Sequence, residues 1–431
     1  MSRTPSAELA ASIERRIVDG DLPGGAKLEP VRSAAQRLGL APNTVAAAYR
    51  LLAERGLVKG RGRHGTIVES RPRPTLIPEP VVPDGMVDLA FGGPDPALLP
   101  DLGPVLAGLD GSSATYGDPA VNLDLEMAAR AALAAEGVEG RYLAVTGGAV
   151  DGIERALGAS LRPGDAVGLE DPGWYPIVDL VRAMGLVPVP VAVDGEGMLP
   201  DRLAQVMGRV SAVIVTPRAQ SPTGAALTPE RAAALAALLA ARPEVLVIDD
   251  DHMGPLAGAP LAAVGPQLST WIYVHSFSKS LGPDLRTAVV LGDDVTMDRL
   301  TSRQMVGPAW VSHILQRTVA ELLRSPDVAR RQVEAADAYT ERRRLFHAAM
   351  ESHGMTVVGT TGFNLWVPVD DEDAAVRSAR DNGFVIRAGS PFRHQSGPGV
   401  RVTVSQITAD EADGVARALA HPPRRRTSRA V

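Results

Sequence analysis

The first seventy residues repeat apolar positions at the spacing of an α-helix. Leu9, Ile13 and Ile17 recur at four-residue intervals, and later stretches stop at Gly39 and restart with Pro42 in a first helical turn, where a missing N–H costs nothing. Three stretches predict helices: residues 6–19, 31–38 and 40–56. Two short β-rich pieces follow, on either side of a basic loop bounded by glycines. This order of elements predicts a winged helix-turn-helix module.

From residue 86 onward the pattern is different. Short β-branched or apolar runs alternate with alanine-rich helical stretches, which predicts a mostly parallel sheet covered by helices on both faces. The expected strands are residues 142–146, 165–171, 186–192, 211–217, 244–250, 271–276 and 287–292. Ligands of open α/β sheets gather at the carboxyl ends of the strands. The residues that follow these strands are therefore the first candidates for a site.

A proline-rich stretch separates the two patterns. Residues 70–85 contain five prolines and no periodicity, so an extended, semi-rigid linker is expected there. The chain is accordingly divided into a module at 1–69, the linker at 70–85 and a large domain at 86–420. The last residues, 421–431, are basic and aperiodic, and a disordered end is expected.

Charge also separates the two parts. Residues 1–70 carry 11 Lys and Arg against 7 Asp and Glu, whereas the remainder carries 33 against 43. A basic module suits a polyanion such as double-stranded DNA, and the acidic body argues against nucleic acid lying across it. The absence of cysteine excludes disulfides and thiolate metal sites and fits the cytoplasm. No apolar run reaches the roughly 18 residues of a membrane span, so no membrane partner is expected.

The third predicted helix would enter the major groove of DNA. The polar candidates for DNA contacts are Asn43, Thr44 and Arg50 on this helix, and Arg61, Arg63 and His64 on the wing. The side chains expected in the core are Val45, Tyr49 and Leu52. A small helical domain with a solvated basic face is the alternative interpretation.

The module resembles the gntR-type DNA-binding module over residues 8–68, in the pattern DGDLPGGAKLEPVRSAAQRLGLAPNTVAAAYRLLAERGLVKGRGRHGT. The resemblance implies that Arg32 and Thr44 contact DNA. The family usually has an arginine where this chain has Pro42, so the operator sequence does not carry over.

One lysine stands out in the large domain. Only three of the 44 basic residues are lysines, and Lys279 lies in the stretch SFSKSLGPDLR. Guanidinium stays protonated, so a Schiff base requires an amine that arginine cannot replace. Nearby Ser276 and Ser278 offer hydroxyls, and Arg286 offers a planar fork suited to phosphate. This set suits a phosphorylated aldehyde such as pyridoxal 5'-phosphate. The alternative is a surface lysine in a serine-rich loop.

Further candidates follow other strands. Gly147, Gly148 and Ala149 precede a helix and could direct backbone N–H groups at a phosphate, although an ordinary strand-to-helix turn has the same pattern. Trp174, beside a Pro-Gly turn, could stack on a planar ring or belong to the core. A third loop holds Gln220, Ser221 and Thr223.

Three consecutive acids, residues 249–251, lie at the end of the strand predicted at 244–250. A pyridinium nitrogen keeps its proton beside a carboxylate, and strand alternation favours Asp250 because its neighbours should point to the other face. A metal site in DDDH is the alternative, although oxygen-rich metal sites usually draw ligands from several segments, and no metal is expected. Arg401 lies in an apolar strand, which suits either a substrate carboxylate or a buried acid.

Residues 86–420 resemble a fold-type I pyridoxal phosphate enzyme of the aminotransferase class, through YGDP, TGG, EDPG, SPTG, IDDDH and SFSKSLGPDLR in that order. Joined to a gntR-type module, the chain resembles the MocR subfamily. The implied fold is a winged helix-turn-helix followed by an α/β aminotransferase-like domain with a small C-terminal α/β subdomain. TPRAQSPTG, GPDLR and WVSHILQ are similar to members associated with vitamin B6 salvage genes.

This resemblance assigns roles to the candidates. Lys279 would form the Schiff base with pyridoxal 5'-phosphate, Asp250 would pair with the pyridine nitrogen, and Trp174 would stack on the ring. The groups implied to hold the phosphate are Ser276, Ser278, Arg286 and the turn at Gly148. Tyr116 would contribute from the partner of a homodimer, and Arg401 would take an amino acid's carboxylate.

Two departures from the family bear on function. His252 and Ser221 stand where aminotransferases place a tyrosine and an asparagine directed at the phenolate oxygen of the ring. This favours a regulator that senses pyridoxal phosphate, a B6 vitamer or an amino acid over an enzyme. The rival hypotheses are a working aminotransferase with a secondary DNA-binding module, and a DNA-binding protein whose large domain holds no ligand.

Overall fold

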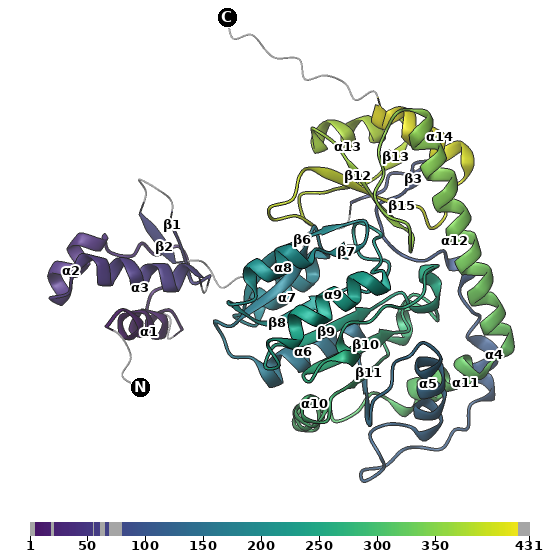
Figure 1. Ribbon diagram of the computed structural model, residues 1–431, viewed down its shortest axis with the longest axis horizontal. Helices are drawn as coiled ribbons and strands as arrows, with labels where there is room; N and C mark the ends of the chain where they lie inside the picture. The colour runs from purple at the N-terminus through teal and green to yellow at the C-terminus, as the bar shows by residue number, and fades with distance from the viewer. Residues whose placement is uncertain (1–4, 19–20, 55, 61–64, 69–79, 421–431) are drawn as a thin grey trace, which may run out of the picture. The chain divides into compact units, whose positions relative to one another are not determined.

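The computed structural model describes residues 5–18, 21–54, 56–60, 65–68 and 80–420 (Figure 1). These residues fall into two compact units, one of which contains all the described N-terminal residues up to Val68. The wing candidates Arg61, Arg63 and His64, residues 69–79 and the end at 421–431 lie outside the described residues.

The N-terminal unit has the predicted winged helix order. Its elements are α1 (Pro5–Val18), α2 (Val31–Leu38), α3 (Pro42–Glu54), β1 (Val58–Gly60) and β2 (Thr66–Val68). Helix α2 ends at Gly39, whose φ of 66° is a left-handed conformation that glycine adopts without strain. The two strands pair antiparallel, with Val58 opposite Val68. Val45 and Leu52 of α3 are fully buried and Tyr49 is nearly so, which confirms the predicted core.

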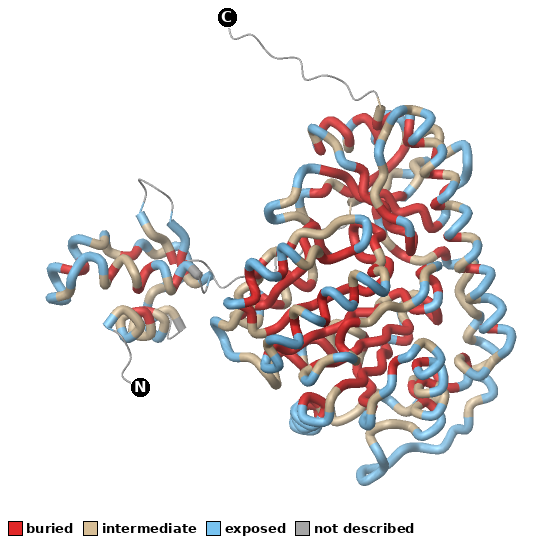
Figure 2. Tube along the Cα trace, in the orientation of Figure 1, coloured by how far each residue is buried: buried red, intermediate tan, exposed pale blue. Residues whose placement is uncertain are grey.

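The large unit is built on an eight-stranded sheet in the order β4-β11-β10-β9-β8-β5-β6-β7. Its strands are β4 (Tyr142–Thr146), β5 (Ala166–Asp171), β6 (Val187–Asp194), β7 (Gly197–Met198), β8 (Val210–Val215), β9 (Leu246–Asp251), β10 (Trp271–Ser276) and β11 (Ala288–Gly292). The seven predicted strands are confirmed. Strand β9 runs parallel to β8 and β10, whereas β11 is antiparallel to both of its neighbours. The strands at the centre of the sheet are almost wholly buried (Figure 2).

Helices separate or cover these strands. They are α4 (Gly103–Gly108), α5 (Leu123–Ala135), α6 (Ala149–Ser160), α7 (Tyr175–Ala183), α8 (Pro200–Val206), α9 (Pro229–Ala240), α10 (Asp294–Val306) and α11 (His313–Arg324). Among them, α6 packs against β10 and β11, and α10 packs against α6 and β4. Within the described ranges, no helix is long and apolar enough to cross a membrane.

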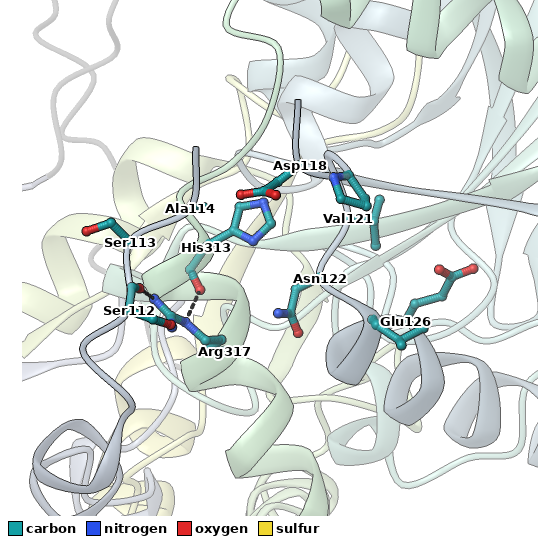
Figure 3. Close-up of a pocket in the computed structure, with 11 residues that line it drawn as sticks. Ser112, Ser113, Ala114, Asp118, Val121, Asn122, Glu126, His313 and Arg317 are labelled. Atoms are coloured by element: carbon teal, nitrogen blue, oxygen red, sulfur yellow. Dashed lines mark hydrogen bonds between the residues drawn. The ribbon is translucent and has the colours of Figure 1, made fainter. Parts of the chain in front are cut away.

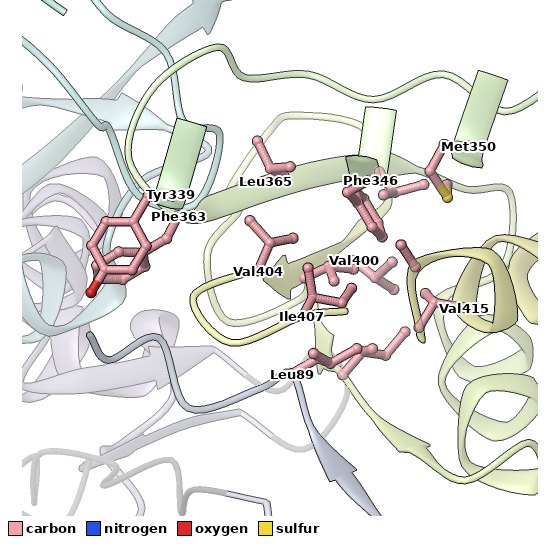
Figure 4. Packing of buried hydrophobic residues seen from close by; sticks show 14 of the residues in the cluster. Leu89, Tyr339, Phe346, Met350, Phe363, Leu365, Val400, Val404, Ile407 and Val415 are labelled. Carbon is pink, nitrogen blue, oxygen red and sulfur yellow. The ribbon is translucent and has the colours of Figure 1, made fainter. Parts of the chain in front are cut away.

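A smaller α/β subdomain follows, and one of its strands comes from an early part of the chain. Its elements are β3 (Val87–Asp88), α12 (Pro326–Ser352), β12 (Asn364–Pro368), α13 (Glu372–Asp381), β13 (Phe384–Val385), β14 (Arg387–Ala388), β15 (Gly399–Thr403) and α14 (Ala409–Ala420). Strand β3 pairs parallel with β13. The apolar core between α12, α14 and these strands includes Leu89, Phe346, Leu365 and Val400 (Figure 4). The first residues after the proline-rich stretch are therefore part of the C-terminal subdomain.

Candidate functional site

In the N-terminal unit, the DNA-contact candidates lie on exposed faces of α2 and α3. Asn43 and Arg50 are exposed on α3, Thr44 is half-buried near its start, and Arg32 is exposed on α2. The two helices pack against each other. The loop before α2 is held from both helices, because Glu29 accepts hydrogen bonds from Arg37 at its carboxylate and from the Tyr49 hydroxyl at its carbonyl, both at 2.8 Å.

In the large unit, Ser276 ends β10, and Ser278, Lys279 and Arg286 follow in the segment between β10 and β11. The Nζ of Lys279 donates a hydrogen bond of 3.0 Å to the carbonyl oxygen of Gly92 and lies 5.7 Å from the centre of the Phe363 ring. Burial, and then the charge of Arg401, lowers the pKa of Lys279 to about 8. A neutral, nucleophilic amine is therefore accessible near physiological pH.

The three consecutive acids at the end of β9 face different surroundings. Asp249 accepts the backbone N–H groups of Val264 at 3.1 Å and Gly265 at 2.7 Å. Asp251 accepts both Nε and Nη2 of Arg218, at 3.0 and 2.7 Å. Asp250 is also buried, but its Oδ1 has no hydrogen-bond partner, and burial raises its pKa to about 7. The part of the chain that the structure describes has no cluster of three His, Asp or Glu suited to a metal ion.

Glu170, near the end of β5, which is separated from β9 by β8, is a buried acid that was not among the candidate residues. It accepts the backbone N–H of Thr216 at 3.1 Å and the hydroxyl of the same residue at 2.8 Å. Burial raises its pKa to about 7, and its charge also contributes to the raised pKa of Asp250. A cation beside Asp250 would favour its carboxylate form, because the attraction would offset both the lost hydration and the repulsion from the neighbouring carboxylates.

An anion cradle lies at the N-terminus of α6. Gly148 precedes the helix with a φ of 101°, and Ala149 is its first residue. A Cβ on Gly148 would lie 3.0 Å from Nη2 of Arg286, and this same nitrogen donates to the carbonyl of Gly147 at 3.4 Å. A helix N-terminus beside a guanidinium is an arrangement that binds phosphate. Ser276 is buried at the end of β10, and its Oγ accepts the N–H of Ser278 at 3.3 Å.

The segment that carries Trp174 is fastened to a loop from the C-terminal subdomain. Trp174 itself is 38% exposed. The Asp171 carboxylate accepts the N–H groups of three consecutive residues, 394–396, at 2.7 to 3.1 Å, together with the Ser396 hydroxyl at 3.0 Å. Gly173 N–H donates to the carbonyl of Phe392 at 2.8 Å. These bonds join residues more than 200 positions apart in sequence.

Two other candidates lie near Lys279. Arg401 is buried, donates to the carbonyl of Ala90 and lies 5.0 Å from the centre of the Phe392 ring. Burial, and then the charge of Lys279, lowers the pKa of His252 to about 4, so its imidazole is neutral at pH 7. Ser221 is buried in the loop after β8. The structure thus brings Lys279, Arg401 and His252 within electrostatic reach of one another.

Tyr116 lies apart from this group in an exposed loop. It is 94% exposed, and its ring makes an edge contact with Trp310, with the ring centroids 5.7 Å apart. The loop is held by Arg317, which donates to the carbonyl oxygens of Asp110 and Ser112 at 3.0 and 2.7 Å. A pocket of about 440 Å³ adjoins this loop, and Asp118 and His313 are among the residues that line it (Figure 3).

These groups fit pyridoxal 5'-phosphate. The cradle at Gly148 and Arg286 suits a phosphate, the unpartnered Oδ1 of Asp250 suits a protonated ring nitrogen, and the Lys279 amine suits an aldehyde. The sequence missed Glu170, Asp171 and the carbonyl of Gly92. Gly92 acts through a partner distant in sequence, so no local pattern marks it. The EDPG motif was the only available signal for the first two.

Two family models match the chain. Residues 86–419 match the model described as aminotransferase class I and II, and residues 5–68 match that of the bacterial regulatory proteins of the gntR family. The vitamin B6 salvage pathway transcriptional repressor PtsJ of Salmonella typhimurium is 38% identical, over 95% of this chain and 96% of its own length. The pyridoxine biosynthesis transcriptional regulator PdxR of Corynebacterium glutamicum is 26% identical over 78% of this chain and 76% of its own.

Solved aminotransferases share the fold of the large unit. An archaeal alanine:glyoxylate aminotransferase has a TM-score of 0.71 at 21% identity, covering 78% of this chain and 90% of its own. A kynurenine aminotransferase of Pyrococcus horikoshii has a TM-score of 0.69 at 20% identity, with the same coverage.

Proposed function

This chain belongs to the MocR subfamily, in which a gntR-type module precedes an aminotransferase class I and II domain, and from this premise we propose that it is a DNA-binding transcriptional regulator that senses pyridoxal 5'-phosphate or an amino compound through Lys279. The observation that carries the proposal is the half-buried Lys279 amine, with its lowered pKa, in a site where the Asp250 Oδ1 suits a cation and the Gly148 cradle suits an anion. The names of PtsJ and PdxR support vitamin B6 metabolism as the regulated pathway.

Each part of the ligand has residues to hold it. When bound, pyridoxal phosphate supplies an aldehyde and an electron-withdrawing ring. The α6 N-terminus, Arg286 and the hydroxyls of Ser276 and Ser278 bind its phosphate, and Asp250 keeps the proton on the ring nitrogen. Trp174 covers the ring, and Arg401 takes the carboxylate of an amino acid.

The residues around Lys279 favour sensing over turnover. The neutral His252 and the hydroxyl of Ser221 stand where aminotransferases direct a tyrosine and an asparagine. The phenolate oxygen of the ring would therefore face an imidazole and an aliphatic hydroxyl in place of a phenol and an amide, which changes the donors that set its proton affinity. Binding is retained, while the proton transfers of transamination lose support.

The regulator acts in the cytoplasm as a homodimer on an operator in double-stranded DNA. Dimerisation is supported by Tyr116, whose ring is 94% exposed and so available to a second copy of the chain. Paired modules also match repeated half-sites in DNA. Tyr116 then completes the phosphate site of the partner.

The test is a DNA-binding profile on fragmented genomic DNA, with the full chain stripped of ligand and with added pyridoxal phosphate. We expect enrichment beside a vitamin B6 gene, at an affinity that changes at least fivefold with the ligand. A Lys279→Ala variant should bind the same DNA without that change. If added pyridoxal phosphate does not change the DNA affinity of the wild type, the sensor hypothesis is wrong.

The rival hypothesis, a working aminotransferase, makes a different prediction. Mixed with amino donors and a keto acid, such an enzyme would complete many turnovers at rates of about 1 s⁻¹ or more. The sensor should complete at most a few.

A further inference from the structure

The residues that follow the proline-rich stretch contact two basic side chains of the site, Arg401 and Lys279. After β3, Leu89 is fixed in the C-terminal subdomain by backbone hydrogen bonds of 2.8 Å to Val385 and from Thr403. The carbonyl of Ala90 then accepts from Arg401, and that of Gly92 accepts from Lys279 at 3.0 Å. We call residues 87–93 the coupling segment.

Local geometry aims these carbonyl groups. The Oδ1 of Asp88 accepts the N–H groups of Ala90 at 2.9 Å and Phe91 at 3.2 Å, which forms a tight turn. Gly92 has a φ of 72°, and a Cβ there would lie 2.9 Å from both Nη atoms of Arg401. The coupling segment packs against the guanidinium of Arg401 and leaves no room for a side chain at Gly92. A ligand group that enters between the segment and the guanidinium must therefore displace the segment.

We propose that the coupling segment is the element through which the ligand state of the site reaches the N-terminal module. The proposal rests on the proposed function, since it assumes a ligand that engages Lys279 and Arg401. Ligand groups compete with the segment's carbonyl oxygens for the same two cations. Because the segment is covalently continuous with the proline-rich stretch, its displacement changes the start of the connection to the module.

The chemistry of the two cations gives the competition its direction. A carboxylate binds guanidinium more strongly than a neutral carbonyl does, so an amino acid's carboxylate displaces Ala90 from Arg401. At Lys279, a C=N bond forms to the aldehyde carbon and the C=O bond breaks, and the oxygen leaves as water with two hydrogens of the nitrogen. The nitrogen then keeps at most one hydrogen. The hydrogen bond that the amine donated to the Gly92 carbonyl is therefore weakened or lost.

Variants of Asp88 test this connection in the full chain. Asp88→Ala removes the turn, and its matched control is Asp101→Ala, because Asp101 makes a similar exposed turn with the N–H of Gly103 at 2.9 Å. Pyridoxal phosphate capture is followed by absorbance and operator affinity by titration. We expect Asp88→Ala to capture the ligand normally but to lose at least fivefold of the ligand's effect on DNA affinity, while Asp101→Ala keeps all of it.

Gly92→Ala tests the same contact from the other side. The added methyl group should push the segment off Arg401, so the ligand-free variant should bind DNA with the affinity of the ligand-bound wild type. Gly137→Ala is the control, since Gly137 has a similar φ of 79° but nothing within 4 Å of its Cβ position. Equal ligand responses in Asp88→Ala and the wild type would overturn the proposal.

Hydrogen exchange of the wild type distinguishes failure of the coupling segment from failure of the proposed sensor function, and it needs no variant. Peptides covering residues 86–93 should exchange faster when pyridoxal phosphate is added, and faster still with an amino acid present. Unchanged exchange in a ligand-bound chain would overturn the coupling segment. If exchange accelerates but operator affinity never responds, the displacement stands and the proposed sensor function fails.

Discussion

The two units keep their functional groups in opposite surroundings. In the N-terminal unit, Arg32, Asn43 and Arg50 are exposed, so their charge and polarity remain solvated in the free protein. In the large unit, Asp250 is buried and Lys279 is half-buried, and the loss of hydration shifts both pKa values against the charged form. Exposed cations cost folding little, whereas buried titratable groups cost free energy that only a ligand offsets. Ligand binding should therefore stabilise the large unit far more than DNA binding stabilises the module.

Replacing Lys279 should give the largest effect. Lys279→Ala removes the only amine at the site, so capture of pyridoxal phosphate should fall by on the order of a thousandfold. The ligand-free variant should also melt at a higher temperature at pH 7, because a destabilising buried charge is gone. Absorbance titration and thermal unfolding measure the two effects. The control is Lys59→Ala, which changes an exposed lysine on β1 and should leave capture intact.

Replacing the exposed arginines should weaken DNA binding but leave the stability of the folded chain almost unchanged. The double variant Arg32→Ala and Arg50→Ala should lose about a hundredfold in DNA affinity and reduce the salt slope by about two. Its free energy of unfolding should change by less than about 0.5 kcal/mol, since both side chains are exposed. Titrations at several salt concentrations check this. Arg344→Ala, on the surface of α12, serves as the control, and an equal loss there would mean that total charge, not the module, binds DNA.

The sequence predicted the two units to different depths. Helices α1, α2 and α3 and the core residues Val45 and Leu52 follow from local apolar spacing, which a single sequence contains. The seven strands of the sheet were equally visible as apolar runs. The antiparallel direction of β11 was not, because strand direction depends on a connection and not on composition.

Within the site, alternation along β9 was enough to separate Asp250 from its two neighbours, which bond to other segments. Contacts between distant segments could not be predicted in this way. Arg401 meets Ala90 across 311 positions, and Asp171 meets Ser396 across 225. Such pairings arise when the C-terminal subdomain packs against the sheet, so they depend on tertiary geometry for which periodicity has no signal.

Replacing Asp250 should change the stability of the large unit by an amount that depends on pH, which the exposed residues of the N-terminal unit should not do. The folded pKa of about 7 lies above the unfolded value, so this carboxyl binds more protons when folded, and its penalty grows as pH rises from about 4 to 7. Asp250→Asn should therefore stabilise the ligand-free chain by about 2 kcal/mol at pH 7.5 and by about a quarter of that at pH 4.5. Thermal unfolding at both pH values measures the difference. A gain of the same size at both would mean that the asparagine acts through packing alone.

The smallest effect concerns the proton on Lys279 itself. Only the neutral amine attacks an aldehyde, so the rate of pyridoxal phosphate capture should rise about tenfold per pH unit and level off near the pKa of about 8. Stopped-flow absorbance between pH 6 and 10 measures the profile. Burial lowers this pKa more than Arg401 does. Arg401→Met should therefore move the break upward by less than about one unit, leaving it below the ordinary lysine value of about 10.4. A break that moves all the way to that value would mean that the charge of Arg401, and not burial, prepares the amine to react.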